Sequence, residues 1–234
     1  MNQDYILLLL SDSALPVGGF VCSSGLEATI QTGNYTDLKS FIKQSLLSVN
    51  SSTIPFIKST FNALKKAKLN EELKEEAIPE VVDRILELDY KFDRMVGLNH
   101  ISKRASLQQG IAYLSLSTKS FNFTNVFKRA LLKQNGGHLP TCFTIVCCFF
   151  ELPLERIIYL YLFLQMRSIV SSAIRLSMIG PYEGQQILFE EASLIDDLMK
   201  IGSADDEDQA HSTWPVLDIV QGSHDRLYTR IFNS

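Results

Sequence analysis

Apolar residues recur three and four positions apart along most of this 234-residue chain. After Thr36, the N-cap that the pattern predicts, Leu38, Ile42 and Leu46 keep the spacing that places side chains on one face of an α-helix. No run of about four to eight residues alternates apolar and polar types between turn signals, as a half-buried strand would. The sequence therefore predicts an all-α fold, a single-domain bundle of roughly eight to ten helices.

Prolines open two of the predicted helices, at Pro55 and Pro79. A proline is tolerated in the first turn because its missing N–H has no intrahelical partner there. The apolar stripe that follows Pro79 has one polar member, Asp89. Further helices are predicted from Phe123 to Leu131, ending at Asn135-Gly136-Gly137, and then over Leu139 to Phe150, Pro153 to about Met178, and Pro181 to Ile201.

The stretch from Leu139 to Ile179 is the most apolar part of the chain. A membrane-spanning helix needs about 20 apolar residues in succession, and charged residues such as Glu151, Arg156 and Arg167 interrupt this stretch. It is therefore expected to form the buried centre of the bundle or a subunit interface, and no association with a membrane is predicted.

The chain is expected to form one domain over residues 1–234, because no linker rich in glycine, proline or serine divides it. Residues 203–212 contain four consecutive acidic residues and are predicted to form a mobile surface loop. Residues 213–234 form an amphipathic, aromatic tail that would fray unless it were docked, so we predict that this tail binds a partner.

Composition and charge exclude several classes of protein. An apolar content of 46% and a charged content of 21% argue against disorder, and a formal net charge of −4 argues against a dedicated nucleic-acid binder. Residues 94–150 nevertheless carry seven basic and no acidic residues, a pattern expected either for a patch that binds an acidic partner or for a surface paired with the acidic final third. No secretory signal is recognised at the N-terminus, and a cytoplasmic location is expected.

Motifs for chemistry are missing from the sequence. It contains no GxxxxGK[ST], GxGxxG or GxSxG motif, and its four histidines stand apart from one another, so neither an enzyme nor a stable metal site is predicted. Cys22 remains a candidate nucleophile beside His100, His138 or His224, an arrangement that the sequence leaves open.

The segment from Asp12 to Glu27 is the least generic part of the chain. Pro16, Gly18 and Gly19 predict a tight turn, and Ser24 followed three residues later by Glu27 predicts a capping box that starts a short helix. On the residues alone, Glu27 is expected to act as a helix cap and Phe20 as a core residue.

This segment resembles the N-terminal signature of the UreF family of urease accessory proteins. The agreement comprises Asp12, Ser13, Leu15, Pro16, Gly18, Phe20, Ser23, Gly25, Leu26 and Glu27. Later blocks that also resemble the family are residues 137–140, 172–176 and 179–185, and the closing residues 224–234. Many members carry histidine where this chain has Cys22, and a thiolate is a softer ligand that can still bind nickel.

The resemblance implies an all-α homodimer that acts as a chaperone for metal-centre assembly rather than as an enzyme. Members bridge the scaffold subunit UreD and the nickel-carrying GTPase UreG, so that nickel reaches apo-urease; no tightly bound cofactor is expected, and nickel would pass in transit. Cys22 is the candidate metal ligand. Alternatives are a helical adaptor unconnected with nickel and a Cys-dependent enzyme.

Two groups of residues are predicted to bind the partners. Arg175 is expected to pair with Asp89, Asp12 or Glu27 and so to order the turn that meets UreG. The tail is expected to dock on UreD, with Arg226 and Arg230 on one face if it is helical. The predicted partner-binding residues are Pro16, Gly18, Phe20, Ser23, Glu27, Arg175, Arg226, Leu227, Tyr228, Arg230 and Phe232.

Overall fold

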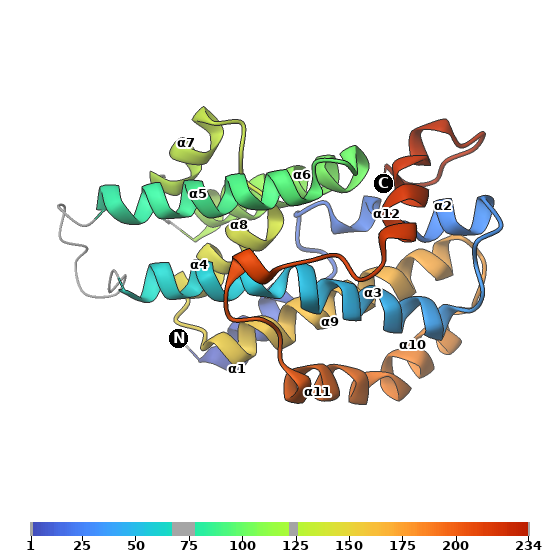
Figure 1. Ribbon diagram of the computed structural model, residues 1–234. Helices are drawn as coiled ribbons and strands as arrows, with labels where there is room; N and C mark the ends of the chain where they lie inside the picture. Colours follow the sequence, from blue (N-terminus) through green and yellow to red (C-terminus); the bar gives the residue numbers. More distant parts are fainter. Residues whose placement is uncertain (1, 67–77, 122–125, 234) are drawn as a thin grey trace.

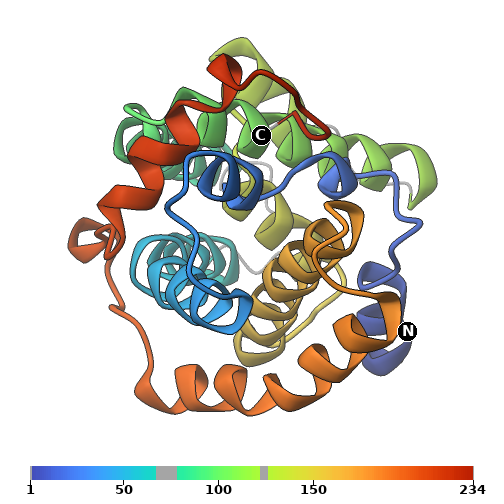
Figure 2. The same cartoon turned by 90° about the vertical axis from the view of Figure 1, so that its right-hand side faces the viewer.

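The computed structural model describes residues 2–66, 78–121 and 126–233 and contains no strand in these ranges, which confirms the predicted all-α class. Figures 1 and 2 show helices gathered around two central ones, α8 (Leu139–Phe149) and α9 (Leu154–Arg175). The helices before them are α1 (Gln3–Leu10), α2 (Leu26–Gln31), α3 (Leu38–Ser52), α4 (Ile54–Lys66), α5 (Ile78–Val96), α6 (His100–Ser120) and α7 (Val126–Lys133). After them come α10 (Pro181–Glu190), α11 (Ala192–Ile201) and α12 (Pro215–Gly222).

The two central helices bury the apolar stretch singled out in the sequence. In α8, residues 139–147 are all buried, and the helix packs against α4, α5 and α6. α9 packs against α2, α3, α4, α10 and α11. α9 is also long and apolar enough to cross a membrane by length and composition, but 56% of that apolar window is buried inside the molecule. Core helices of helical bundles meet the same criteria.

Helix ends differ from the sequence prediction at several places, and two of these change a cap or the course of the chain. The N-cap of α3 is Asp37, not Thr36, and its side chain accepts a hydrogen bond from Ser40 N at 2.8 Å. A carboxylate is as good a cap as a hydroxyl, so the two neighbouring residues were equally good candidates. The helix predicted over 181–201 is broken at Glu191 into α10 and α11, which lets the chain turn around α9. Phe123 lies outside the described residues.

Asp89 is buried, with 2% of its surface exposed, and it joins α5 to the start of α8. Its two carboxylate oxygens accept hydrogen bonds from Gly137 N at 2.7 Å and His138 N at 2.8 Å. The His138 ring lies between Asp93, at 3.0 Å from Nε2, and Ser106, at 3.1 Å from Nδ1. The polar member of the α5 stripe therefore satisfies backbone donors at the N-terminus of the central helix.

The acidic loop of residues 203–212 lies against α4 and α5. Glu207 is 6% exposed and accepts hydrogen bonds from Ser59 at 2.7 Å, Arg84 at 2.7 Å and Lys91 at 3.0 Å. Lys58 binds Asp205 at 2.7 Å. The mobility of the loop stays a prediction, but the charges of Asp205 and Glu207 are paired with cations of α4 and α5 rather than left in water.

Acid is expected to weaken this contact between pH 4.5 and 2. Burial raises the pKa of Glu207, but the hydrogen bonds from Ser59, Lys91 and Arg84 outweigh it and lower the pKa from 4.5 to about 2. Because the folded-state pKa is the lower one, the carboxylate stabilises the protein above the unfolded pKa, and this stability is lost as the pH falls towards 2. The free energy of unfolding of Glu207→Gln should lie below that of wild type at pH 6, and the two should converge near pH 2.

Denaturant titrations at several pH values measure this difference. Asp206→Asn in the same loop is the control, since Asp206 is exposed and its described bond is a local one to Asp208 N. A gap between Glu207→Gln and wild type that stays constant from pH 6 to pH 2 would show that the Glu207 charge does not hold the loop.

Candidate partner-binding surface

The N-terminal signature folds into a turn that needs left-handed backbone. After α1 the chain bends through Gly18, with φ of 76°, into a 3-10 turn at Gly19–Val21, and through Gly25, with φ of 84°, into α2. A Cβ atom on Gly25 would lie 2.8 Å from Leu217 of α12, so this glycine also allows α2 and α12 to approach each other. The predicted tight turn is present, and Pro16 lies exposed within it.

The predicted capping box is wrong. Gly25 is the N-cap of α2 and makes no side-chain cap bond, while Ser24 lies at φ of 53°. Glu27 is 1% exposed and reaches the C-terminal tail instead. Its oxygens bind His224 Nε2 at 2.9 Å, Ile231 N at 2.7 Å and Phe232 N at 3.2 Å. Glu27 therefore satisfies backbone donors about two hundred residues away rather than those of its own helix.

Arg175 lies between two aromatic rings. Its guanidinium carbon is 3.8 Å from the centroid of Phe20 and 4.3 Å from that of Phe232, and Nη1 donates a hydrogen bond to the Phe20 carbonyl. The predicted carboxylate partners are wrong: Asp89 and Glu27 bind backbone amides. Arg175 contacts the turn through the carbonyl and the ring of Phe20, and that it orders the turn stays a prediction. Phe20 is 64% exposed on its other side, so it is not a core residue.

The tail runs beside the turn, as Figure 2 shows at the end of the bundle. Asn233 N donates to Val21 O at 2.9 Å, and Gln31 Nε2 donates to Thr229 O at 2.9 Å. The tail after α12 contains one 3-10 turn, His224–Arg226, so Arg226 and Arg230 do not share a helix face. Phe232 is 3% exposed and packs inside its own chain, whereas Tyr228 is 99% exposed.

Asp225 forms ion pairs with two arginines at this end of the molecule. Arg104 binds it through two hydrogen bonds of 3.0 and 2.9 Å, and Arg230 binds it at 3.1 Å. The hydrogen bonds from Arg104 are the main cause that lowers the pKa of Asp225 to about 2. The basic middle third of the chain thus pairs with the acidic final third at Arg104, while Lys103 pairs with Asp93.

Turn and tail together form one continuous surface, which we call the turn–tail surface. Its apolar members are the exposed side chains of Phe20, Val21, Tyr228 and Ile231, and its cations are Arg104, Arg226 and Arg230. Of the predicted residues, Gly18, Phe20, Glu27, Arg175 and the tail residues meet at this end, and Ser23 is buried beneath it.

Catalytic and metal-binding arrangements can be tested on the described residues. Cys22 Sγ accepts a hydrogen bond from Gln109 Nε2 at 3.3 Å, whereas His138 binds Asp93 and His224 binds Glu27. His100 lies 3.4 Å from Asp225. The histidines considered as bases for Cys22 therefore have other partners. The group of three close ligands within the described ranges is Asp206, Glu207 and Asp208, and it does not include Cys22.

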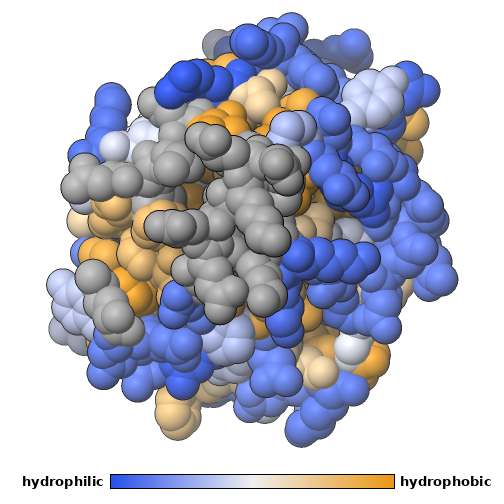
Figure 3. All heavy atoms as spheres, turned by 90° about the vertical axis from the view of Figure 1, so that its left-hand side faces the viewer, coloured by the Kyte–Doolittle hydropathy of each residue, from blue (hydrophilic) through white to orange (hydrophobic). Residues whose placement is uncertain are grey.

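The end of the molecule opposite the turn–tail surface, near α7, carries hydrophobic, hydrophilic and basic side chains. Figure 3 shows hydrophobic side chains interspersed among hydrophilic ones there. α7 lies at this end in Figure 1 and presents the basic residues Lys128, Arg129 and Lys133. The prediction that the basic third binds an acidic partner now concerns its exposed cations, such as Arg94, Lys119 and Arg129, since Arg104 and Lys103 are paired within the chain.

Comparison with known proteins identifies the family. The UreF family model matches residues 33–192, which is more than half of the chain. The chain belongs to the UreF family. It is 27% identical to Urease accessory protein 6 of Cryptococcus neoformans var. grubii, over 98% of this chain and 96% of that protein. It is 30% identical to Urease accessory protein F of Arabidopsis thaliana, over 96% and 90%, and 29% identical to UreF of Bacillus sp. strain TB-90, over the whole of both chains.

The UreF model match leaves out both parts of the turn–tail surface, because it begins at residue 33 and ends at residue 192. UreF of Bacillus sp. strain TB-90 covers these parts, since its alignment spans 100% of this chain. Sequence reasoning found the turn and the tail separately. It missed His224 as the partner of Glu27 and Arg104 as the partner of Asp225, because nothing in the sequence marks pairs so far apart.

Proposed function

We propose that the chain is a non-enzymatic accessory protein of urease maturation, which bridges UreD and UreG so that nickel reaches apo-urease. The family supports the accessory role, since its curated relatives are named urease accessory proteins. The observation that carries the proposal is the turn–tail surface. Two signature blocks at opposite ends of the chain converge on it and leave aromatic and cationic side chains exposed.

The chemistry of this surface suits binding rather than catalysis. Exposed aromatic residues and arginines are the types that dominate the energetics of protein interfaces. Tyr228 is 99% exposed, and the exposed Arg226 nearby in the tail favours an acidic partner face, whereas Arg104 and Arg230 pair with Asp225. UreG was expected at the turn and UreD at the tail; these two expectations now concern one surface, so a test must measure the two partners separately.

Three further properties belong to the same proposal. The protein acts as a homodimer in the cytoplasm, holds no cofactor tightly, and lets nickel pass in transit as the cargo of UreG. Light scattering measures the mass of the isolated protein and so tests the dimer. Equilibrium dialysis against nickel, with Cys22→Ser as the comparison, tests whether the metal binds this chain.

Replacement of Arg175 is expected to impair urease activation more than folding. Arg175→Ala removes the cation between Phe20 and Phe232 and the donor to the Phe20 carbonyl, so the turn loses its anchor to α9. Two ring contacts and one charged hydrogen bond are together worth about 2–4 kcal/mol, enough for at least a tenfold loss of the ordered turn. The readouts are nickel-dependent activation of apo-urease by the reconstituted complex, co-purification with UreD and UreG, and helical circular dichroism.

Two variants serve as controls for Arg175→Ala. Arg175→Lys keeps the charge but not the planar group that stacks on both rings, and it should give an intermediate loss. Lys66→Ala removes an exposed cation at the C-terminal end of α4 and should activate urease like wild type. If Arg175→Ala supports full activation, the turn is not a partner site; if it loses its helical signal, Arg175 is a folding residue.

A further inference from the structure

Helix α10 carries two exposed aromatic side chains on one face. Tyr182 is 94% exposed and Phe189 is 85% exposed. They are seven residues apart in the helix, so they lie two turns apart on the same side, with their backbones separated by about 10 Å. Gln186 is exposed between them. We call these three residues and the exposed glutamates beside them, Glu183 and Glu190, the α10 face.

The other side of α10 packs on α9, which gives the α10 face a fixed position. Ile187 is 6% exposed, and a Cβ atom on Gly184 would lie 2.7 Å from Ile174 Cδ1 of α9. On the face itself, Gln186 Nε2 donates to Glu190 Oε1 at 2.7 Å. A surface whose backbone is already ordered loses little conformational freedom when a partner binds. The two rings are therefore accessible without a rearrangement of the fold.

The surroundings of the α10 face are acidic. Residues 181–201 contain five acidic residues and one basic residue. Glu190 and Glu191 share one cation, Lys39, whose Nζ lies 2.7 and 3.9 Å from their carboxylate oxygens. Glu183 has no ion pair among the residues that the structure describes. The face therefore combines apolar rings with an excess of negative charge.

The α10 face and the turn–tail surface lie on different sides of the bundle. Figures 1 and 2 show α10 and α11 along the lower side, whereas the C-terminal tail lies on the upper side. The turn–tail surface exposes the cation Arg226, so the two surfaces also differ in the sign of their charge. Surfaces of opposite charge select different partners, because each repels the partner of the other.

We propose that the α10 face is a second docking surface and that it binds a helical segment of a partner protein in which lysines or arginines alternate with apolar residues. The inference rests on the proposed function, because a bridge between two partners needs two separate surfaces. Aromatic ring faces attract ammonium and guanidinium groups, and Glu183 forms an ion pair with them. The spacing of Tyr182 and Phe189 matches side chains two turns apart on a partner helix.

Other occupants fit the α10 face less well. A second copy of this chain would bring its own α10 face, and each copy carries five acidic residues and one basic residue over 181–201. Like charges held together in an interface are unfavourable. The negative surface of an anionic membrane would be repelled for the same reason. A basic protein segment covers the two rings and neutralises the charge at once.

A synthetic helix of leucine and lysine, about 14 residues long, tests the α10 face without either partner. Its binding to the full-length protein is measured by fluorescence anisotropy. Replacement of both rings, Tyr182→Ala with Phe189→Ala, should weaken binding about tenfold or more, because buried aromatic anchors dominate interfaces. Glu183→Lys should also weaken it, and the same peptide with glutamate in place of lysine should not bind.

Two substitutions on α5 serve as matched controls for the peptide. Tyr90→Ala removes a tyrosine that is 60% exposed, and Asp83→Lys reverses an exposed charge. Both should bind the peptide like wild type. All the substituted positions are exposed, so helical circular dichroism should not change. If the double variant nevertheless loses helical signal, Glu183→Lys decides the result.

Photo-crosslinking identifies the occupant in the reconstituted complex with UreD, UreG and apo-urease. A benzoylphenylalanine residue is placed at position 189, and the crosslinked peptides are located by mass spectrometry. The crosslinks should fall in a segment of one partner that is rich in lysine or arginine. The double variant Tyr182→Ala/Phe189→Ala should lose capture of that partner about tenfold or more and should retain the other.

Several results would overturn the docking surface. They are crosslinks to a second copy of this chain alone, crosslinks to a segment without an excess of basic residues, no crosslink to a partner, full capture of both partners by the double variant, and equal binding of the peptide by wild type and the double variant. Failure of the wild-type protein to capture either partner counts against the proposed function instead. The peptide then still decides whether the α10 face binds basic helices.

Discussion

Glu27→Ala is expected to release the C-terminal tail and to abolish capture of UreD while most of the helical bundle stays folded. The substitution removes the acceptor for Ile231 N, Phe232 N and His224 Nε2, which are bound at 2.7, 3.2 and 2.9 Å. The loss of three bonds to a buried carboxylate costs about 2–5 kcal/mol. The tail can escape this cost by detaching, because its freed amides then bind water.

Limited digestion with trypsin measures this release. Arg226 and Arg230 are exposed, yet both lie in a segment tied down on each side, so cleavage there should accelerate at least tenfold in Glu27→Ala. Helical circular dichroism should fall only slightly. Glu27→Gln keeps one acceptor, so its cleavage rate should lie between those of wild type and Glu27→Ala. Glu183→Ala, at an exposed position of α10, should be cleaved like wild type. Unchanged cleavage would show that the remaining tail contacts suffice.

Helical periodicity predicted most of the fold because it reports a local property. A stripe such as that of α5 is buried wherever the helix packs, so its residues can be identified without knowing the neighbour. Asp89 was recognisable by the same reasoning as a polar residue on a buried face. The partners of Asp89 could not be recognised, since Gly137 and His138 come from a segment nearly fifty residues later.

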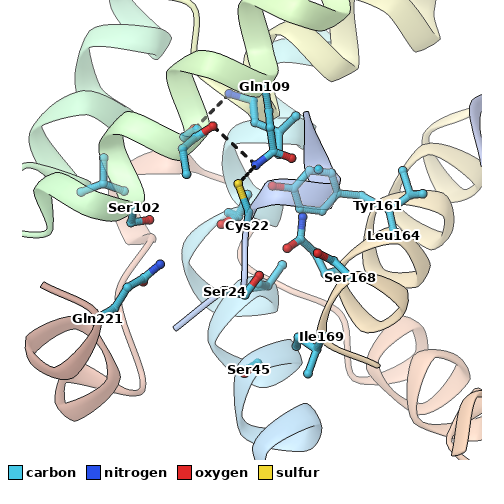
Figure 4. A pocket seen from close by; sticks show the side chains of 18 of the residues that line it. Cys22, Ser24, Ser45, Ser102, Gln109, Tyr161, Leu164, Ser168, Ile169 and Gln221 are labelled. Atoms are coloured by element: carbon cyan, nitrogen blue, oxygen red, sulfur yellow. Dashed lines mark hydrogen bonds between the residues drawn. The ribbon is translucent and has the colours of Figure 1, made fainter. Parts of the chain in front are cut away.

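The sequence identified most residues of the turn–tail surface but not the contacts that they make. The turn was identified from its proline and glycines and the tail from its amphipathic pattern, and the resemblance then assigned partners to both. The structure brings turn and tail together through Glu27 and Arg175. Sequence reasoning assigned Glu27 to its own helix because local caps are common, and it assigned a carboxylate to Arg175 because buried arginines usually pair with one. In both cases distant backbone groups, which have no sequence signature, supplied the partner instead. A cavity of about 680 Å³ beside Cys22 (Figure 4) is equally invisible in the sequence, because serines of five separate segments line it.

Asp89→Ala is expected to destabilise the whole bundle by about 3 kcal/mol or more. It leaves Gly137 N and His138 N without acceptors in the interior, and each buried donor without a partner costs about 1–3 kcal/mol. Unlike the tail held by Glu27, the start of α8 cannot detach to reach water, because residues 139–147 are buried among α4, α5 and α6. The cost therefore falls on global unfolding.

Denaturant titration followed by circular dichroism measures the effect of Asp89→Ala. This substitution is expected to lower global stability, whereas Glu27→Ala is expected to release only the tail. Asp89→Asn retains one acceptor but turns an amide N–H towards the other donor, so it should recover less than half of the loss. Asp83→Ala, at an exposed position of α5, should change the free energy of unfolding by less than about 0.5 kcal/mol. If Asp89→Ala instead leaves global stability intact and only speeds proteolysis near residues 134–137, then the segment before α8 opens independently. The anchoring of α8 would in that case come from apolar packing alone.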